Sequence, residues 1–157
     1  MKIIQQFEFG SADVLKVMQC ELPQLLDGEV LIKGAYTSIN FADIKNRTGA
    51  KAKGAFPMTL GLDMVGTISE SRSNQFQVGD RVIAFPKNGS YAELAVAHES
   101  LTYKIPDTLS FEQAAAMPTV SFLAAILVGK VGAVTEEDTV IIHSAAGGVG
   151  SMLVQLC

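Results

Sequence analysis

Small residues near the end of the chain are spaced as they are in a phosphate-binding turn. The stretch 145–150 reads AAGGVG and fits the spacing G-x-G-x-x-G with alanine at the first position. A small first residue permits a tight turn out of a strand, Gly147 lets the backbone approach a pyrophosphate, and Gly150 lets the next helix pack closely. Backbone N–H groups at the helix start would then face phosphate oxygens. The residues expected to bind such a ligand are Ala145, Ala146, Gly147, Gly148, Val149 and Gly150.

The surroundings of this turn favour a dinucleotide site over the alternative, a tight strand-to-helix connection with no ligand. The segment TVIIH (139–143) predicts a buried parallel strand before the turn, and SMLVQL (151–156) predicts a helix after it. A P-loop is excluded because the sequence contains no G-K-[ST]. The acidic residue that reads the ribose would lie ~20 residues beyond the glycines, past Cys157. We therefore expect the chain to be the N-terminal part of a longer protein.

The elements that lead up to this turn begin with short β-like segments between residue 1 and about residue 106. Runs of β-branched and aromatic residues alternate with Gly, Asn and Asp turns, for example at Gly79-Asp80 and Asn88-Gly89. Many short strands with turns between them predict a closed or nearly closed β-barrel. The segment NFADIKNRTG (40–49) predicts one short helix that ends at Gly49.

Helical patterns begin after Pro106. Ser110 and Gln113 form the signature of a capping box, and the alanines that follow favour a helix. Pro118 should end or kink that helix. The segment TVSFLAAILVG (119–129) predicts a second, buried helix that closes at Gly129.

Composition limits the classes of function. The chain has 157 residues, 48% of them hydrophobic, and a formal net charge of −4 with scattered basic residues. No basic patch argues for nucleic acid, and no apolar run is long enough to span a membrane. The N-terminus does not show the pattern of a signal peptide, and two distant cysteines predict neither a disulfide framework nor a zinc cluster. These features favour a cytoplasmic protein.

Taken together, these segments resemble the medium-chain dehydrogenase/reductase superfamily, and most closely its zinc-independent quinone oxidoreductases of the zeta-crystallin type. The matching stretches, in the family's order, are GAYTSINFADIKNRTG, FPMTLGLDMVGTI, QVGDRVIAF, GSYAELAVA, IPDTLSFEQAAAMP and HSAAGGVGSMLVQL. The resemblance implies a mainly β GroES-like barrel followed by the start of an α/β Rossmann domain that is truncated here. We place the barrel domain at residues 1–118 and the incomplete Rossmann domain at residues 119–157.

The resemblance also tests for zinc. Zinc-dependent members place a ligand cysteine where Asn40 stands, and a histidine-glutamate pair where Leu62 and Asp63 stand. An asparagine amide and a leucine side chain do not replace thiolate and imidazole around zinc. We therefore expect no metal site, and we interpret His98 and His143 as ordinary strand or loop residues.

The resemblance further implies hydride transfer from NADPH, with NAD as a possible alternative, to a small quinone or enone, by a homodimer when the protein is full length. Asn40 would then lie near the nicotinamide and could donate through its NH₂ group, and Asp43 could orient the cleft or the cofactor amide. Both residues are our candidates for catalysis. The alternatives remain open, since Asn40 suits a helix cap and Asp43 suits the first turn of a helix.

Other features qualify this hypothesis. Leu123 stands where the family often has a threonine close to the nicotinamide, which puts one cofactor contact in doubt. Tyr36 and Tyr91 could line a substrate cleft, but we favour buried barrel aromatics. We expect little or no turnover from these 157 residues alone. The competing hypotheses are a non-catalytic GroES-like interaction module and a relative of the zinc alcohol dehydrogenases.

Overall fold

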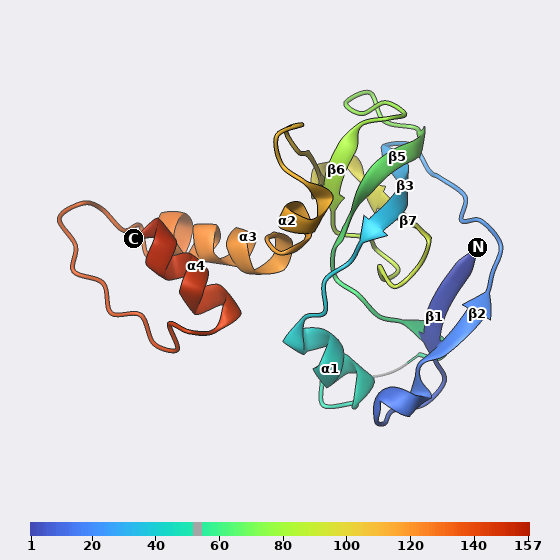
Figure 1. Ribbon diagram of the computed structural model, residues 1–157, viewed down its shortest axis with the longest axis horizontal. Helices are drawn as coiled ribbons and strands as arrows, with labels where there is room; N and C mark the ends of the chain where they lie inside the picture. Colours follow the sequence, from blue (N-terminus) through green and yellow to red (C-terminus); the bar gives the residue numbers. More distant parts are fainter. Residues whose placement is uncertain (52–54) are drawn as a thin grey trace. The chain divides into compact units, whose positions relative to one another are not determined.

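The computed structural model describes residues 1–51 and 55–157 and divides into two compact units (Figure 1). The first unit is Met1–Ala116 and the second unit is Met117–Cys157. The strands in the described part of the chain all lie in the first unit, whereas the second is helical. The domain boundary expected after residue 118 stays a prediction.

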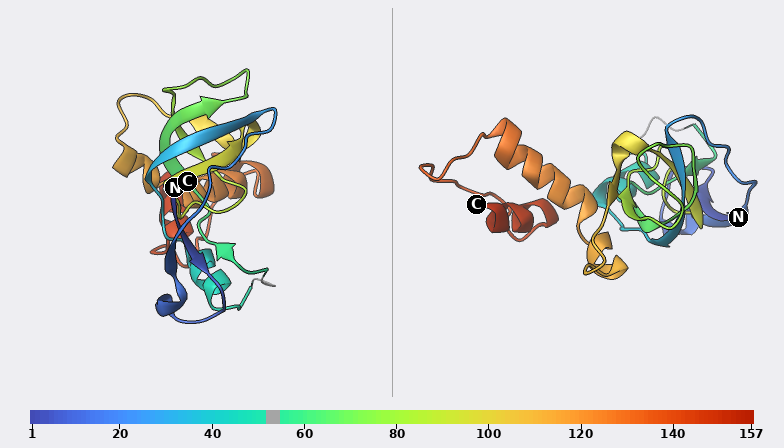
Figure 2. Two further views of the ribbon diagram at one scale, coloured as in Figure 1. Left: turned by 90° about the vertical axis from the view of Figure 1, so that its right-hand side faces the viewer. Right: turned by 90° about the horizontal axis from the view of Figure 1, so that it is seen from above.

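Two antiparallel sheets form the first unit. One has the strand order β2-β1-β4, and the other has the order β7-β3-β5-β6-β8. A bridge between Ile3 and Ala92 links them. Seen from above, the five-stranded sheet curves around a common centre (Figure 2). The strands are β1 (Lys2–Gln6), β2 (Lys16–Gln19), β3 (Glu29–Tyr36), β4 (Met58–Thr59), β5 (Met64–Ser71), β6 (Arg81–Ala84), β7 (Leu94–His98) and β8 (Thr102–Lys104).

The central strands owe their burial to runs of β-branched and apolar side chains. Strand β3 pairs with β5 on one side and β7 on the other, so its first four residues are buried. Side chains from β3, β5, β6 and β7 meet in one core cluster, consistent with the β-propensity of these segments. The members of this cluster are Val30, Ile32, Met64, Ile68, Val82, Ala84, Ala95 and Ala97.

Short helices complete the first unit where capping residues predict them. Helix α1 (Phe41–Arg47) begins after Asn40, and helix α2 (Phe111–Ala115) begins after Ser110. The backbone N–H of Gln113 donates to the Ser110 hydroxyl at 3.2 Å, and the Ser110 N–H donates to the Gln113 side chain at 3.1 Å. The predicted capping box is therefore confirmed. Two 3₁₀ turns, η1 (Ala12–Val14) and η2 (Glu99–Leu101), lie between strands.

The second unit contains helix α3 (Pro118–Ile126), a π-helical turn η3 (Leu127–Val131) and helix α4 (Gly148–Leu156). Pro118 is the first residue of α3, a position that needs no backbone N–H donor. The expected end at Gly129 is wrong, because η3 carries the helical path on to Val131. The expectation of a buried helix is also wrong: Leu123 and Ile126 are 44% and 47% exposed. Within this unit α3 packs against α4 along one side (Figures 1 and 2).

The strand expected at residues 139–143 is absent from the described structure. These residues form loop and turn, and Ile141 is 81% exposed. A parallel strand requires a hydrogen-bonded neighbour, and no described residue pairs with this segment. The helix expected at 151–156 lies within α4 and is confirmed. None of the described helices is long and apolar enough to cross a membrane.

Candidate functional site

The candidate residues Asn40 and Asp43 lie in the first unit, where the chain leaves β3 and enters α1. Asp63 lies directly before β5 and accepts a hydrogen bond from Asn40. Asp43 and Asp63 are 2% and 1% exposed, so both carboxyl groups need hydrogen-bond donors within the protein. We call this set of contacts the Asn40 network, and its members are Thr37, Ser38, Asn40, Asp43, Asp63 and Ser90.

The amide group of Asn40 donates to two partners. Its Nδ2 atom lies 3.0 Å from Oδ2 of Asp63 and 2.9 Å from Oγ of Ser38. Ser38 in turn donates from its hydroxyl (2.6 Å) and from its backbone N–H (3.2 Å) to Oδ1 of Asp63. Both oxygens of Asp63 therefore accept hydrogen bonds, and Asn40 is tied to a residue 23 positions away.

Asp43 joins the start of α1 to the loop before β5. Its Oδ2 accepts from the backbone N–H of Asn40 at 2.8 Å, and its Oδ1 accepts from the backbone N–H of Gly61 at 3.1 Å. Burial raises the pKa of the Tyr91 phenol well above its ordinary value, and the charge of Asp43 and a hydrogen bond to it raise this pKa further. Asp43 thus stabilises the neutral form of Tyr91.

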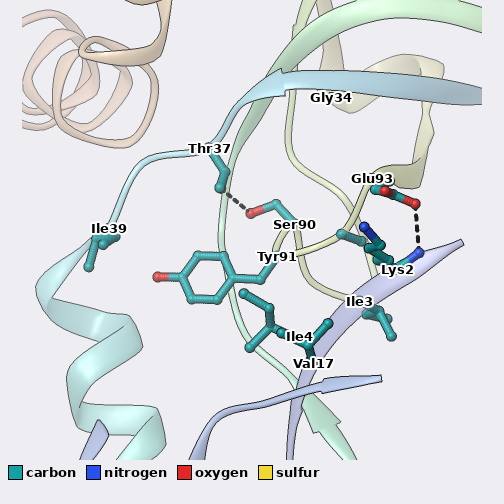
Figure 3. Close-up of a pocket in the computed structure, with 11 residues that line it drawn as sticks. Lys2, Ile3, Ile4, Val17, Gly34, Thr37, Ile39, Ser90, Tyr91 and Glu93 are labelled. Carbon is teal, nitrogen blue, oxygen red and sulfur yellow. Dashed lines mark hydrogen bonds between the residues drawn. The ribbon is translucent and has the colours of Figure 1, made fainter. Parts of the chain in front are cut away.

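Thr37 and Ser90 close the other side of the network. Thr37 donates its hydroxyl hydrogen to the backbone carbonyl of Asp63 at 2.7 Å. A hydroxyl group has one hydrogen, so in the 2.7 Å contact between Thr37 and Ser90 the donor is Ser90 (Figure 3). Gly61 has φ +100°, and a Cβ there would lie 2.1 Å from Oγ of Ser90. Glycine is therefore required where the loop before β5 meets Ser90.

A mainly apolar cavity of about 540 Å³ lies beside this network (Figure 3). The ring of Tyr91 lies across it, with Thr37 and Ser90 at one side and Ile3, Ile4 and Val17 at the other.

The interpretation of Tyr36 and Tyr91 as buried barrel aromatics is wrong. Tyr91 lines the cavity and is only partly buried. Tyr36 is 44% exposed, and its hydroxyl donates to Glu112 at 2.5 Å. Tyr36 lies at the end of β3, where the strand has left the core, so its ring stands at the surface.

The glycine turn lies in the second unit. Gly147 is the N-cap of α4, and its N–H donates to the carbonyl of Ser144 at 2.9 Å. The next N–H groups belong to the first helical turn, which has no preceding carbonyls to bind. A Cβ at Gly150 would lie 2.2 Å from the Ser144 carbonyl oxygen and 2.8 Å from Cα of Ala145. Gly150 therefore permits the close approach of α4 to the turn, whereas the packing of this helix on a preceding strand, which the spacing predicts, is not seen among the described residues because 139–143 form no strand.

The positions where zinc-dependent members have metal ligands hold Asn40, Leu62 and Asp63 in this chain. The Asn40 amide donates a hydrogen bond to the Asp63 carboxylate. Among residues 1–51 and 55–157, no group of three or more His, Cys, Asp or Glu residues could hold a metal ion. His98 instead caps η2 by accepting from the backbone N–H of Ser100 at 3.2 Å.

Sequence reasoning missed Thr37, Ser38 and Ser90. The first two precede Asn40 in the run TSIN, and Ser90 follows Gly89 in a turn. Clusters of Ser, Thr and Asn before a helix signal capping, but this signal carries no information about Asp63, which lies far along the chain.

Comparisons with known proteins agree with this architecture. Residues 26–107 match the family described as the alcohol dehydrogenase GroES-like domain. Mouse quinone oxidoreductase is 34% identical over 161 residues, which covers 99% of this chain and 49% of that protein. Human synaptic vesicle membrane protein VAT-1 homolog-like is 31% identical over 160 residues, covering 100% of this chain and 38% of that protein.

Solved structures show the same fold. The crystal structure of Escherichia coli quinone oxidoreductase complexed with NADPH superposes with a TM-score of 0.91 at 26% identity, covering 99% of this chain and 49% of that one. The chain thus spans half or less of the length of these relatives. Its structure corresponds to a GroES-like domain followed by the start of a Rossmann domain.

Proposed function

Because the chain belongs to the alcohol dehydrogenase GroES-like domain family of the medium-chain dehydrogenase/reductase superfamily, we propose that the protein containing it is an NADPH-dependent oxidoreductase. Its substrate class would be quinones or α,β-unsaturated carbonyl compounds. The observation that carries the proposal is the turn Ala145–Gly150 at the start of α4, together with the NADPH complex of a similar structure.

The glycine turn suits a pyrophosphate. Gly147 has no side chain to cover the N-terminus of α4, and the helix is nine residues long. The N–H groups of Gly148 and Val149 are in its first turn, where the helix dipole favours an anion. We propose that Ala145, Ala146, Gly147, Gly148, Val149 and Gly150 hold the cofactor phosphates.

The Asn40 network would serve the reacting end of the cofactor. NADPH, when bound, would supply the hydride for the reduction, and the matching proton would come from solvent. Asn40 would contact the bound molecules, and Asp43 would hold the backbone of Asn40 and the loop at Gly61 in place. We propose that the reaction needs no zinc, because an asparagine amide and a leucine side chain do not replace thiolate and imidazole as zinc ligands.

The test uses the protein expressed from its complete native reading frame. Oxidation of NADPH, followed by absorbance, should depend on a quinone or an enone and should survive dialysis against a metal chelator. Gly147→Val should weaken NADPH binding at least ~10-fold, which corresponds to ~1.4 kcal/mol. Gly129→Ala is the matched control, since a Cβ there meets nothing within 4 Å.

Several outcomes would contradict the proposal. Failure of the wild-type protein to bind NADPH would refute it, as would activity that the chelator removes and zinc restores. In the second case the zinc alcohol dehydrogenase hypothesis would replace it. Assembly as a homodimer and a cytoplasmic location remain predictions, to be checked by light scattering and by fractionation of cells.

A further inference from the structure

The hydrogen bonds that join Asn40, Ser38 and Asp63 fix one another's directions. The Ser38 hydroxyl has one hydrogen, and its 2.6 Å contact with the Asp63 carboxylate uses it. The Ser38 oxygen can then only accept at its 2.9 Å contact with Asn40. Oδ2 of Asp63 also accepts from Asn40, at 3.0 Å. Both hydrogens of the Asn40 amide are therefore in use.

The opposite orientation of this amide is unfavourable. A flip would place the Asn40 carbonyl oxygen against the Asp63 carboxylate, where two acceptors would face each other without a hydrogen. Asp63 cannot turn to relieve this contact, because it is 1% exposed and its other oxygen accepts two hydrogen bonds from Ser38. The carbonyl oxygen takes part in the capping box of α1 with the backbone N–H of Asp43, and it keeps acceptor capacity for a further donor because an amide oxygen has two lone pairs.

We propose that Asn40 meets its ligand as a hydrogen-bond acceptor, so that the group it binds is a donor, an amide N–H or a hydroxyl, and not the developing oxyanion of the substrate. In this arrangement Asp63 and Ser38 are positioning residues that fix the amide. The proposal rests on the proposed function, because it takes the ligand at Asn40 to be the nicotinamide half of NADPH. That half carries both kinds of donor, a carboxamide and ribose hydroxyls.

The decisive variant exchanges the two partners. Asn40→Asp combined with Asp63→Asn keeps a donor–acceptor pair between the two positions and keeps the net charge. Aspartate is also a good helix cap, so α1 should be preserved. In the intact protein the exchanged pair still presents an acceptor to the ligand. We expect the exchanged pair to bind NADPH more tightly than Asn40→Ala does, because Asn40→Ala removes the acceptor and should weaken NADPH binding at least ~10-fold.

A cofactor analogue identifies the donor. The 3-acetylpyridine analogue of NADP⁺ has a methyl ketone in place of the carboxamide and therefore lacks its N–H group. If the carboxamide is the donor, the wild-type protein should bind the analogue more weakly, and Asn40→Ala should add little further loss. If a ribose hydroxyl is the donor, the analogue should bind the wild type as well as NADP⁺ does, and Asn40→Ala should weaken both equally.

The amide orientation has its own readout. In a ¹⁵N-labelled sample, the side-chain N–H₂ hydrogens of Asn40 should exchange with solvent more slowly than those of exposed Asn74, and Asp63→Ala should remove this protection. Exchange as fast as that of Asn74 would overturn the proposal. So would an exchanged pair that melts like wild type and binds NADPH normally but loses more than ~100-fold in kcat, because Asn40 would then act as a donor to the oxyanion. If the wild type binds no NADPH, the proposed function fails, while the exchange rates still decide the orientation.

Discussion

The substitution Asp43→Asn tests how strongly one buried carboxylate holds α1 to the loop before β5. The two oxygens of the Asp43 carboxylate accept hydrogen bonds from the backbone N–H groups of Asn40 at 2.8 Å and of Gly61 at 3.1 Å. An asparagine keeps one oxygen and brings an NH₂ group against the other N–H, so one buried donor loses its acceptor. A buried unsatisfied donor costs about 1–3 kcal/mol, and the surviving bond loses the strength that an ionised acceptor gives. We expect the free energy of unfolding to fall by about 2–4 kcal/mol.

The assay is equilibrium unfolding in urea, followed by circular dichroism. The midpoint should move to lower urea with little change in slope. Asp107→Asn is the matched control, because that side chain is 99% exposed and its 3.5 Å contact with Arg81 lies at the surface. This control should unfold like wild type. A loss below about 0.5 kcal/mol for Asp43→Asn would refute the reasoning, since the network would then tolerate an unpaired donor.

Three further changes test other parts of the chain. Gly150→Ala should destabilise the second unit by several kcal/mol, because the added Cβ would lie 2.2 Å from the Ser144 carbonyl oxygen. Gly129→Ala is the control, because a Cβ there meets nothing within 4 Å. Thermal melts of the two variants test the difference. Burial and Asp43 raise the pKa of Tyr91 above its ordinary value of 10.0, so the folded state holds the phenol proton more tightly than the unfolded state does. The contribution of Tyr91 to stability should therefore be level below pH 10 and fall as the pH rises beyond it. Tyr91→Phe should reduce this alkaline loss in urea titrations at several pH values. Ser110→Ala removes the cap of α2 and should cost about 1 kcal/mol; an unchanged midpoint would show that the capping box contributes nothing.

Local patterns in the sequence were a reliable guide to helix starts. The capping boxes depend on contacts between residues three positions apart, such as Ser110 with Gln113. Both partners therefore lie within one short stretch of sequence, where the pattern can be recognised. The same holds for the glycine turn, where the need for a small residue at Gly150 arises from Ser144 and Ala145 just before it. Strand-forming segments were recognisable from β-branched runs, although their order in the sheets was not.

The strand at 139–143 shows where local reasoning failed. Its apolar run has the composition of a buried parallel strand, but a strand forms only when a neighbour supplies hydrogen bonds. In the part of the chain that the structure describes, no segment pairs with it, and Ile141 is exposed.

The sequence by itself determined the kinds of group available: an amide at position 40, carboxylates at 43 and 63, and a turn without side chains at the start of the last helix. Only the tertiary structure decided how these groups face one another. The pairing of Asn40 with Asp63 spans 23 residues, and that of Thr37 with Ser90 spans 53. Such contacts depend on how the sheets return the chain to one place, and so does the direction in which the Asn40 amide points. Side-chain type is fixed by the sequence, but the direction of a hydrogen bond depends on every partner around it.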